Sequence, residues 1–61
     1  MNEIKNIPIL KEAEEYCSCT ETGRSIKPGE DVIYYREGEM YYGLDSIHGE
    51  MITNLSMYIA Y

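Results

Sequence analysis

Sixty-one residues can form one domain at most, and a chain this short buries only about 60% of the surface that its unfolded form exposes. Domains of this size usually need disulfides, a metal ion or a partner to stay folded. The net charge of −6 excludes the basic footprint that nucleic-acid binding requires, so we expect no direct nucleic-acid ligand.

The cysteine content and the absence of long apolar runs indicate a compartment. Cys17 and Cys19 are too close in the sequence to form an unstrained disulfide, so we expect free thiols in a reducing environment. No leader sequence is evident, and no run approaches the roughly 20 apolar residues of a membrane span. We therefore expect a soluble, cytoplasmic protein with no membrane partner and no cofactor.

The N-terminal stretch is the least defined by the sequence. We expect one small domain over residues 1–61, in which residues 1–8 form a flexible arm. Residues 9–16 fit two structures. Their apolar side chains have the i, i+4, i+7 spacing of a short helix, but the alternation that follows them is typical of a strand. Both interpretations stay open at this point.

The middle of the chain predicts a β-hairpin. Two runs rich in Val, Ile and Tyr, residues 31–36 and 39–43, flank Glu37-Gly38, which suits a two-residue loop. Turn sequences precede them at residues 21–23 and 27–30. The predicted register pairs Tyr35 with Met40, Tyr34 with Tyr41 and Ile33 with Tyr42. Both faces of this hairpin are apolar or aromatic, so we expect both to be covered.

The last stretch, from Ser46 to the end of the chain, predicts a helix. Asp45 or Ser46 can cap its first amides, and Gly49 weakens it by about 1 kcal/mol. Its apolar side chains gather on one arc of a helical wheel, which we expect to face the core. The members of this arc are Ile47, His48, Met51, Ile52, Leu55, Tyr58 and Ile59.

The order of these elements resembles the treble-clef, or zinc-ribbon-like, family. The run Cys19-Thr-Glu-Thr22-Gly-Arg-Ser-Ile-Lys-Pro-Gly-Glu is similar to a zinc knuckle and its loop, and Tyr42-Gly43-Leu-Asp-Ser46 stands where the second ligand pair opens a helix. The resemblance implies a zinc site at Cys19, Thr22, Gly43 and Ser46, three of which are not ligands here. We therefore expect a metal-free α+β domain with a knuckle-like turn, a central antiparallel β-hairpin and a C-terminal α-helix.

A different metal site is the alternative. Zinc takes about four ligands, and Cys17, Cys19, His48 and a carboxylate such as Asp45 could supply them. The favoured interpretation is that no metal binds, that the two thiols are small buried hydrophobic groups, and that the histidine is hydrogen-bonded in or near the core.

Charge and tyrosine content indicate the partner. Eleven acidic residues oppose five basic ones, and the chain carries seven tyrosines, a residue favoured at interfaces. We expect a protein partner with a basic surface, such as a protein that itself binds nucleic acid. The competing interpretation is a charge that only maintains solubility. The candidate contact residues are Tyr34, Tyr41, Glu37, Glu39 and Tyr61.

The sequence carries no catalytic constellation, because one histidine and these spacings support no Ser-His-Asp set. We expect a non-enzymatic interaction protein. Its size and charge are typical of phage or mobile-element proteins that bind and inhibit or modulate a host protein. The alternatives are a structural or assembly subunit, which includes a homo-oligomer, and the small zinc domain described above.

Overall fold

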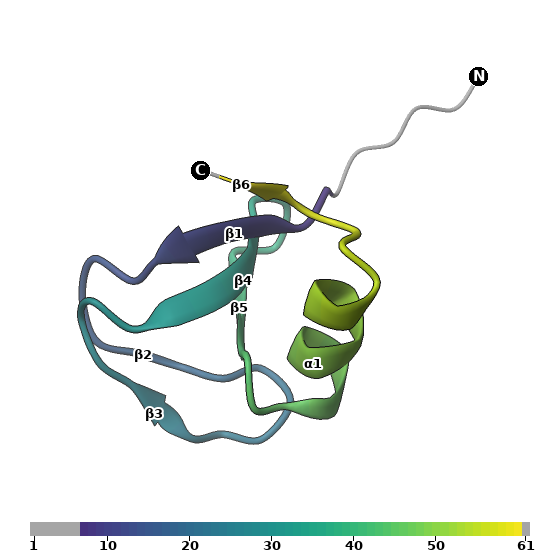
Figure 1. The fold of residues 1–61 in the computed structure, drawn as a ribbon. Coiled ribbons are helices and arrows are strands. Elements are labelled where there is room, and N and C mark those ends of the chain that lie inside the picture. The colour runs from purple at the N-terminus through teal and green to yellow at the C-terminus, as the bar shows by residue number, and fades with distance from the viewer. Residues whose placement is uncertain (1–6, 61) are drawn as a thin grey trace.

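The computed structural model describes residues 7–60, so most of the predicted arm and Tyr61 lie outside the described residues. The fold is α+β, as the sequence predicts, with a mixed four-stranded sheet, a separate two-stranded hairpin and one helix (Figure 1). The elements in chain order are β1 (Ile9–Glu12), β2 (Cys17–Ser18), β3 (Ser25–Ile26), β4 (Asp31–Tyr35), β5 (Met40–Gly43), α1 (Ile47–Asn54) and β6 (Ile59–Ala60).

The larger sheet has the strand order β5-β4-β1-β6. Strand β1 pairs with β4 in the antiparallel sense, with Leu10 opposite Ile33. This pairing decides the open question in favour of a strand for residues 9–12, and residues 13–16 form the loop that follows it. Strand β6 then adds to the other side of β1 in the parallel sense, and the Ile59 N–H donates to the Pro8 carbonyl (3.0 Å).

The central hairpin has the predicted register, with Tyr35 opposite Met40 and Tyr34 opposite Tyr41. The strands are one residue shorter on each side than predicted, because residues 36–39 form the turn. The Glu39 N–H donates to the Arg36 carbonyl (3.2 Å). Gly38, at φ 88°, supplies the left-handed conformation that this turn requires.

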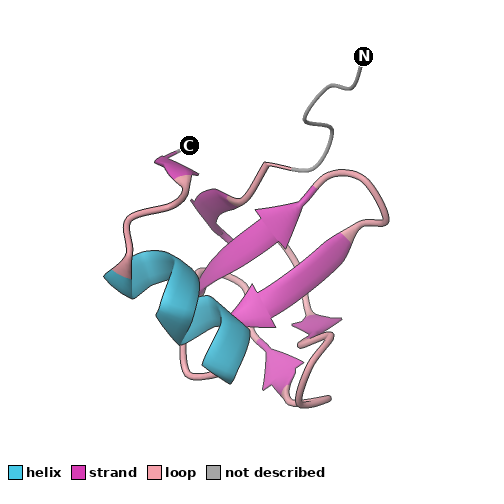
Figure 2. Ribbon diagram, turned by 90° about the vertical axis from the view of Figure 1, so that its right-hand side faces the viewer, coloured by secondary structure: helices cyan, strands magenta, loops and turns pink. Residues whose placement is uncertain are grey.

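Two small cores lie on opposite faces of β4, because side chains alternate along a strand. Val32 and Ile33 are both fully buried. Val32 packs with Ala13, Cys19 and Ile26, whereas Ile33 packs with Tyr35 and Ile52. The β2–β3 hairpin and α1 lie on different sides of β4 (Figures 1 and 2). Both faces of the hairpin are therefore covered, as predicted.

The helix is much shorter than predicted, because it ends at Asn54 and the chain returns to the sheet as β6. Ser56 takes the left-handed conformation (φ 54°) just after the helix. The Met57 N–H donates to the Ile52 carbonyl (3.0 Å), and the Ser56 N–H to the Thr53 carbonyl (3.1 Å). This pair of bonds is a Schellman motif, which ends a helix by satisfying carbonyl groups of its last turn.

The helix also faces the core with a different side from the one predicted. Of the arc, Ile52 is buried and His48 and Tyr58 are half-buried, but Ile47 is 77% exposed and Leu55 60%. Met51 and Ile59 are exposed as well. The physical reason for this orientation is backbone packing, because the helix contacts the end of β5 through the buried residue Gly49.

The predicted capping of the helix is present. The Ser46 hydroxyl accepts the Gly49 N–H (3.0 Å) and donates to the Gly43 carbonyl (2.7 Å). Ser46 is 1% exposed, so its hydroxyl would be costly to bury without these two bonds. Within residues 7–60, no helix has the length and apolar character needed to cross a membrane.

Candidate functional site

Two of the positions of the predicted zinc frame, Thr22 and Gly43, contact the sulfur atom of a third, Cys19. The Thr22 N–H and the Gly43 N–H both approach Cys19 Sγ, at 3.5 and 3.4 Å. The fourth position, Ser46, bonds Gly43 and not the sulfur: its hydroxyl donates to the Gly43 carbonyl (2.7 Å). The turn and the end of β5 are also held together at Thr20, whose N–H donates to the Tyr41 carbonyl (2.7 Å).

The environment of Cys19 favours the thiolate. Burial by itself raises the pKa of this thiol, but hydrogen bonds from Thr22, Gly43 and Glu21 outweigh it and lower the pKa from 9.0 to about 7. The side chain is only 2% exposed, which denies reagents access to the sulfur. Cys19 therefore combines an activated thiol with a position inside the core.

An ionic network covers the same end of β5. Arg24 Nη2 contacts the Glu30 carboxylate and lies 3.1 Å from Asp45 Oδ1. Gly43 leaves the space for this network, because a Cβ at that position would lie 2.6 Å from Asp45 Oδ1 and 2.7 Å from Arg24 Nη2. The bond to Arg24 is the main cause that lowers the pKa of Glu30.

The alternative metal site is not assembled in the structure. Among residues 7–60, no three His, Cys, Asp or Glu side chains are grouped closely enough to hold a metal ion. Cys17 and Cys19 belong to the core under β2–β3, Asp45 is bonded to Arg24, and His48 lies against the other core. The structure therefore does not bring Cys17, Cys19, His48 and Asp45 together as one group.

His48 has the hydrogen-bonded position that the favoured interpretation gave it. Its Nε2 lies 2.5 Å from the Tyr35 hydroxyl, and its ring packs on Tyr42 at 4.5 Å between centroids. Its backbone N–H donates to a carboxylate oxygen of Glu21 (2.9 Å). These contacts attach the first turn of α1 both to the sheet and to Glu21 in the turn after β2, which is a structural role.

The candidate binding site is a hollow of about 210 Å³ between the β1–β2 loop and β5, which we call the acidic hollow. Three carboxylates, two tyrosine rings, one ammonium group and one thiol line it. The residues are Lys11, Glu14, Glu15, Tyr16, Cys17, Glu39 and Tyr41. Carboxylates and aromatic faces together are the groups that proteins use to receive a cation.

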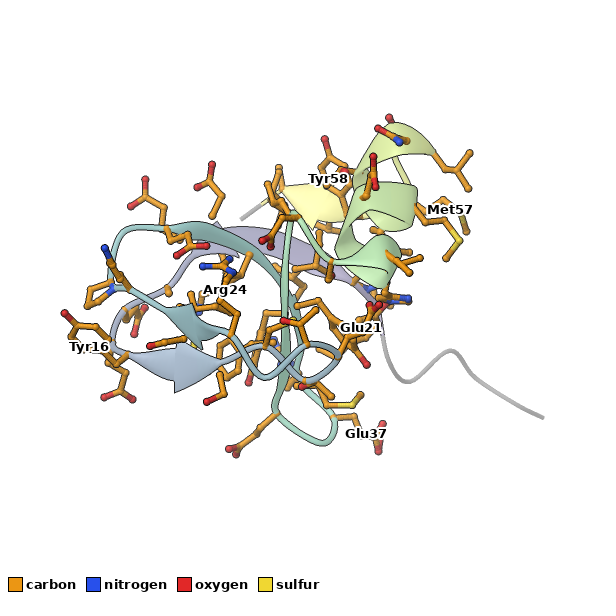
Figure 3. All side chains as sticks on the ribbon, turned by 90° about the horizontal axis from the view of Figure 1, so that it is seen from below. Tyr16, Glu21, Arg24, Glu37, Met57 and Tyr58 are labelled. Carbon is orange, nitrogen blue, oxygen red and sulfur yellow. The ribbon has the colours of Figure 1, made fainter. Side chains whose placement is uncertain are left out.

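The two tyrosines of the acidic hollow differ in how far they are packed against the sheet. Tyr41 stacks on Tyr34 with 4.8 Å between ring centroids, and Lys11 Nζ lies 5.0 Å from the centroid of Tyr34. Lys11 is also 3.9 Å from the Glu14 carboxylate. Tyr16 is 70% exposed and points outward beside β2 (Figure 3). One ring is thus packed in the sheet and the other is exposed to solvent.

The electrostatics of the hollow are those of an anionic site. Burial raises the pKa of Tyr41, and Tyr34, Cys17, Glu39 and Glu15 raise it further. The pKa of Cys17 is raised by burial first and by Glu30 and Glu15 after it. Both shifts favour the neutral phenol and the neutral thiol, so the negative charge of the site resides on its three carboxylates, opposed by the ammonium group of Lys11.

The structure brings together three of the five predicted contact residues. Tyr41 and Glu39 line the hollow, and Tyr34 supports it from behind. Glu37 is exposed in the turn of the central hairpin but does not line the hollow (Figure 3). Tyr61 lies outside the described residues.

Sequence reasoning missed the other half of the site. Glu14, Glu15 and Tyr16 come from the loop after β1, which the sequence left between helix and strand. The run of acidic residues that ends in a tyrosine was the available signal. Comparison with protein-family models, with curated protein sequences and with solved structures finds no match to this chain.

Proposed function

We propose that this chain is a non-enzymatic protein-binding module whose acidic hollow receives a lysine or arginine side chain of a basic partner. The observation that carries the proposal is that Glu14, Glu15 and Glu39 line one hollow together with Tyr16 and Tyr41. The inserted cation would find carboxylate oxygens for charge-assisted hydrogen bonds and an aromatic face for cation–π contact.

The charge of the whole chain supports the same class of partner. The net charge is −6, and no Lys or Arg occurs between Glu37 and Tyr61. A field of this sign speeds the encounter with a positively charged surface. If the partner uses its basic surface to bind nucleic acid, this chain would block that surface. We propose this mode of inhibition, in which a phage or mobile-element protein acts on a host protein.

The test uses an eight-residue lysine peptide as the probe and two-dimensional NMR of the full chain. We expect shift changes concentrated at residues 14–17 and 39–41, and at least about tenfold weaker binding when the salt concentration is raised from 0.05 to 0.5 M. A glycine-serine peptide of equal length should leave the spectrum unchanged. Shift changes spread evenly over all acidic residues, or binding indifferent to salt, would contradict the proposal.

We also propose that the fold is a treble-clef-like frame that has lost its metal. The support is the position of Cys19 Sγ, which receives N–H bonds from the two places where such a frame holds its ligand pairs, Thr22 and Gly43. Backbone N–H groups directed at sulfur are what a ligating thiolate needs around it.

Restoring the ligands tests this relationship. The triple variant Thr22→Cys, Gly43→Cys, Ser46→Cys should bind one Zn²⁺ and show the visible absorption of tetrahedral Co²⁺, since Arg24 and Asp45 can move aside from position 43. Adding Cys19→Ser should weaken the metal affinity. A folded triple variant that shows no tetrahedral Co²⁺ spectrum would contradict the treble-clef assignment.

A further inference from the structure

An exposed row of apolar side chains runs along the outer face of α1. Ile47, Met51 and Leu55 are 77%, 47% and 60% exposed. Their i, i+4, i+8 spacing places them in one line, which we call the apolar row. Met57, 56% exposed, continues the apolar surface past the helix and points outward at the end of the molecule opposite Tyr16 (Figure 3).

We infer that a second copy of this chain docks on the apolar row, helix against antiparallel helix. The row is self-complementary, because Met51 lies at its centre and branched residues of similar size, Ile47 and Leu55, lie equally far on either side. A two-fold axis through Met51 then places Ile47 of one copy opposite Leu55 of the other. Rows of i, i+4 side chains are the ridges by which helices commonly pack, and such a contact closes as an isologous dimer.

Charge argues against a basic partner on this surface. Glu50 is the only residue of α1 with a formal charge, if His48 is taken as neutral, and the row itself contains none. A cationic surface would bury its charges against methyl and methylene groups without compensation. The row therefore suits another apolar surface, and the apolar row of a second copy has the matching length and composition.

The exposed area fits a weak dimer. The apolar row and Met57 together present roughly 400–500 Å² per copy, within the range of the functional patches of small proteins. Two such patches bury less than the roughly 1,200 Å² of a standard stable interface. A domain of this size, with its marginal core, gains stability from association.

Two variants with opposite introduced charges test the orientation. Ile47→Glu adds an anion at the first turn and Leu55→Lys a cation at the last, and the helix dipole favours both. Each alone should weaken self-association, measured by sedimentation equilibrium up to millimolar protein, at least about tenfold. Mixing the two should restore a heterodimer, because position 47 of one copy then faces position 55 of the other. The control Tyr16→Ala, remote from the row, should leave the dimer unchanged.

Salt separates this dimer from the proposed partner binding. Copies of net charge −6 repel each other, so added salt should strengthen the dimer, whereas it should weaken binding of the lysine peptide. For unmodified protein, shifts that depend on concentration should appear at residues 47, 51 and 55, which keeps the inference testable if a variant fails to fold. A chain that stays monomeric at millimolar concentration, or a mixture no better associated than either single variant, would overturn it.

Discussion

Gly49 lies so close to Gly43 that a side chain at position 49 could not fit, since a Cβ there would be 2.1 Å from the Gly43 carbonyl oxygen. The contact joins the first turn of α1 to the end of β5. A glycine that weakens the helix by its intrinsic propensity is thus the residue that lets the helix pack.

Gly49→Ala should therefore destabilise the protein, although alanine is the better helix former. The neighbour at position 49 is backbone, which cannot rotate away, so we expect a loss of about 1–3 kcal/mol in the free energy of unfolding. Urea denaturation measures it. The matched control is Asn54→Ala, at an exposed position of the same helix, which should be neutral or slightly stabilising. If Gly49→Ala and Asn54→Ala changed the free energy of unfolding equally, the close approach of Gly49 to Gly43 would not be the reason for the position of the helix.

The fully buried Ile33 should be far more sensitive to truncation than the exposed Ile47. Ile33→Ala leaves a cavity between β4 and α1 and should cost about 2–5 kcal/mol, which is comparable to the whole stability of a domain this small. Ile47→Ala makes the same chemical change at an exposed site and should shift stability by less than about 0.5 kcal/mol. Circular dichroism during thermal unfolding distinguishes them. A comparable loss in both variants would mean that the helix face has been assigned wrongly.

Ser56→Gly should stabilise the protein. Ser56 holds φ 54° to close the Schellman motif, a conformation that costs a residue with a Cβ about 1 kcal/mol or more. We expect a gain of up to about 1 kcal/mol in urea denaturation. Ser18→Gly, in the exposed part of β2, should instead lose a little stability, because glycine weakens strands. A loss at position 56 would show that the helix does not end there.

Cys19 should contribute stability that depends on pH. Its pKa is lowered from 9.0 to about 7 in the folded protein, so its contribution is fully present above pH 9 and is lost as the pH falls through 7. The difference in free energy of unfolding between wild type and Cys19→Ser, in reducing buffer, should grow by on the order of 2 kcal/mol from pH 6 to pH 9. Cys17 is present in both proteins, so its own titration cancels in this difference. A difference that is constant with pH would contradict the hydrogen bonds to the sulfur.

The central hairpin was the most predictable part of the fold, and the reason is local. Two short runs of apolar and aromatic residues on either side of Gly38 indicate the strands and their register without reference to the rest of the chain. The position of Ser46 as the helix cap is equally local. Features that depend on a few consecutive residues can be read from the sequence.

The end and the orientation of the helix could not be predicted in this way. The helix ends at a left-handed residue, a position that glycine usually occupies. Here that residue is Ser56, so the sequence has no glycine to indicate the end of the helix. The buried side is set by the contact between Gly49 and Gly43, which a count of apolar side chains does not include. The two-residue pairing of β6 with β1 is too short to leave a pattern.

Half of the acidic hollow was within reach of the sequence. Glu39 and Tyr41 belong to the hairpin, whose faces the sequence defined, and they were predicted as contacts. Glu14, Glu15 and Tyr16 meet them only because β1 pairs with β4 and turns the following loop toward β5. That long-range pairing has no signature in the local sequence.

The most direct test of the acidic hollow compares two triple variants that remove the same charge. Glu14→Gln, Glu15→Gln, Glu39→Gln neutralises the hollow, whereas Glu12→Gln, Asp31→Asn, Glu50→Gln neutralises three exposed acids elsewhere. At equal salt, we expect the first variant to bind the eight-residue lysine peptide at least about tenfold more weakly than the second. Equal affinities would show that net charge alone attracts the peptide and that the hollow is not the binding site.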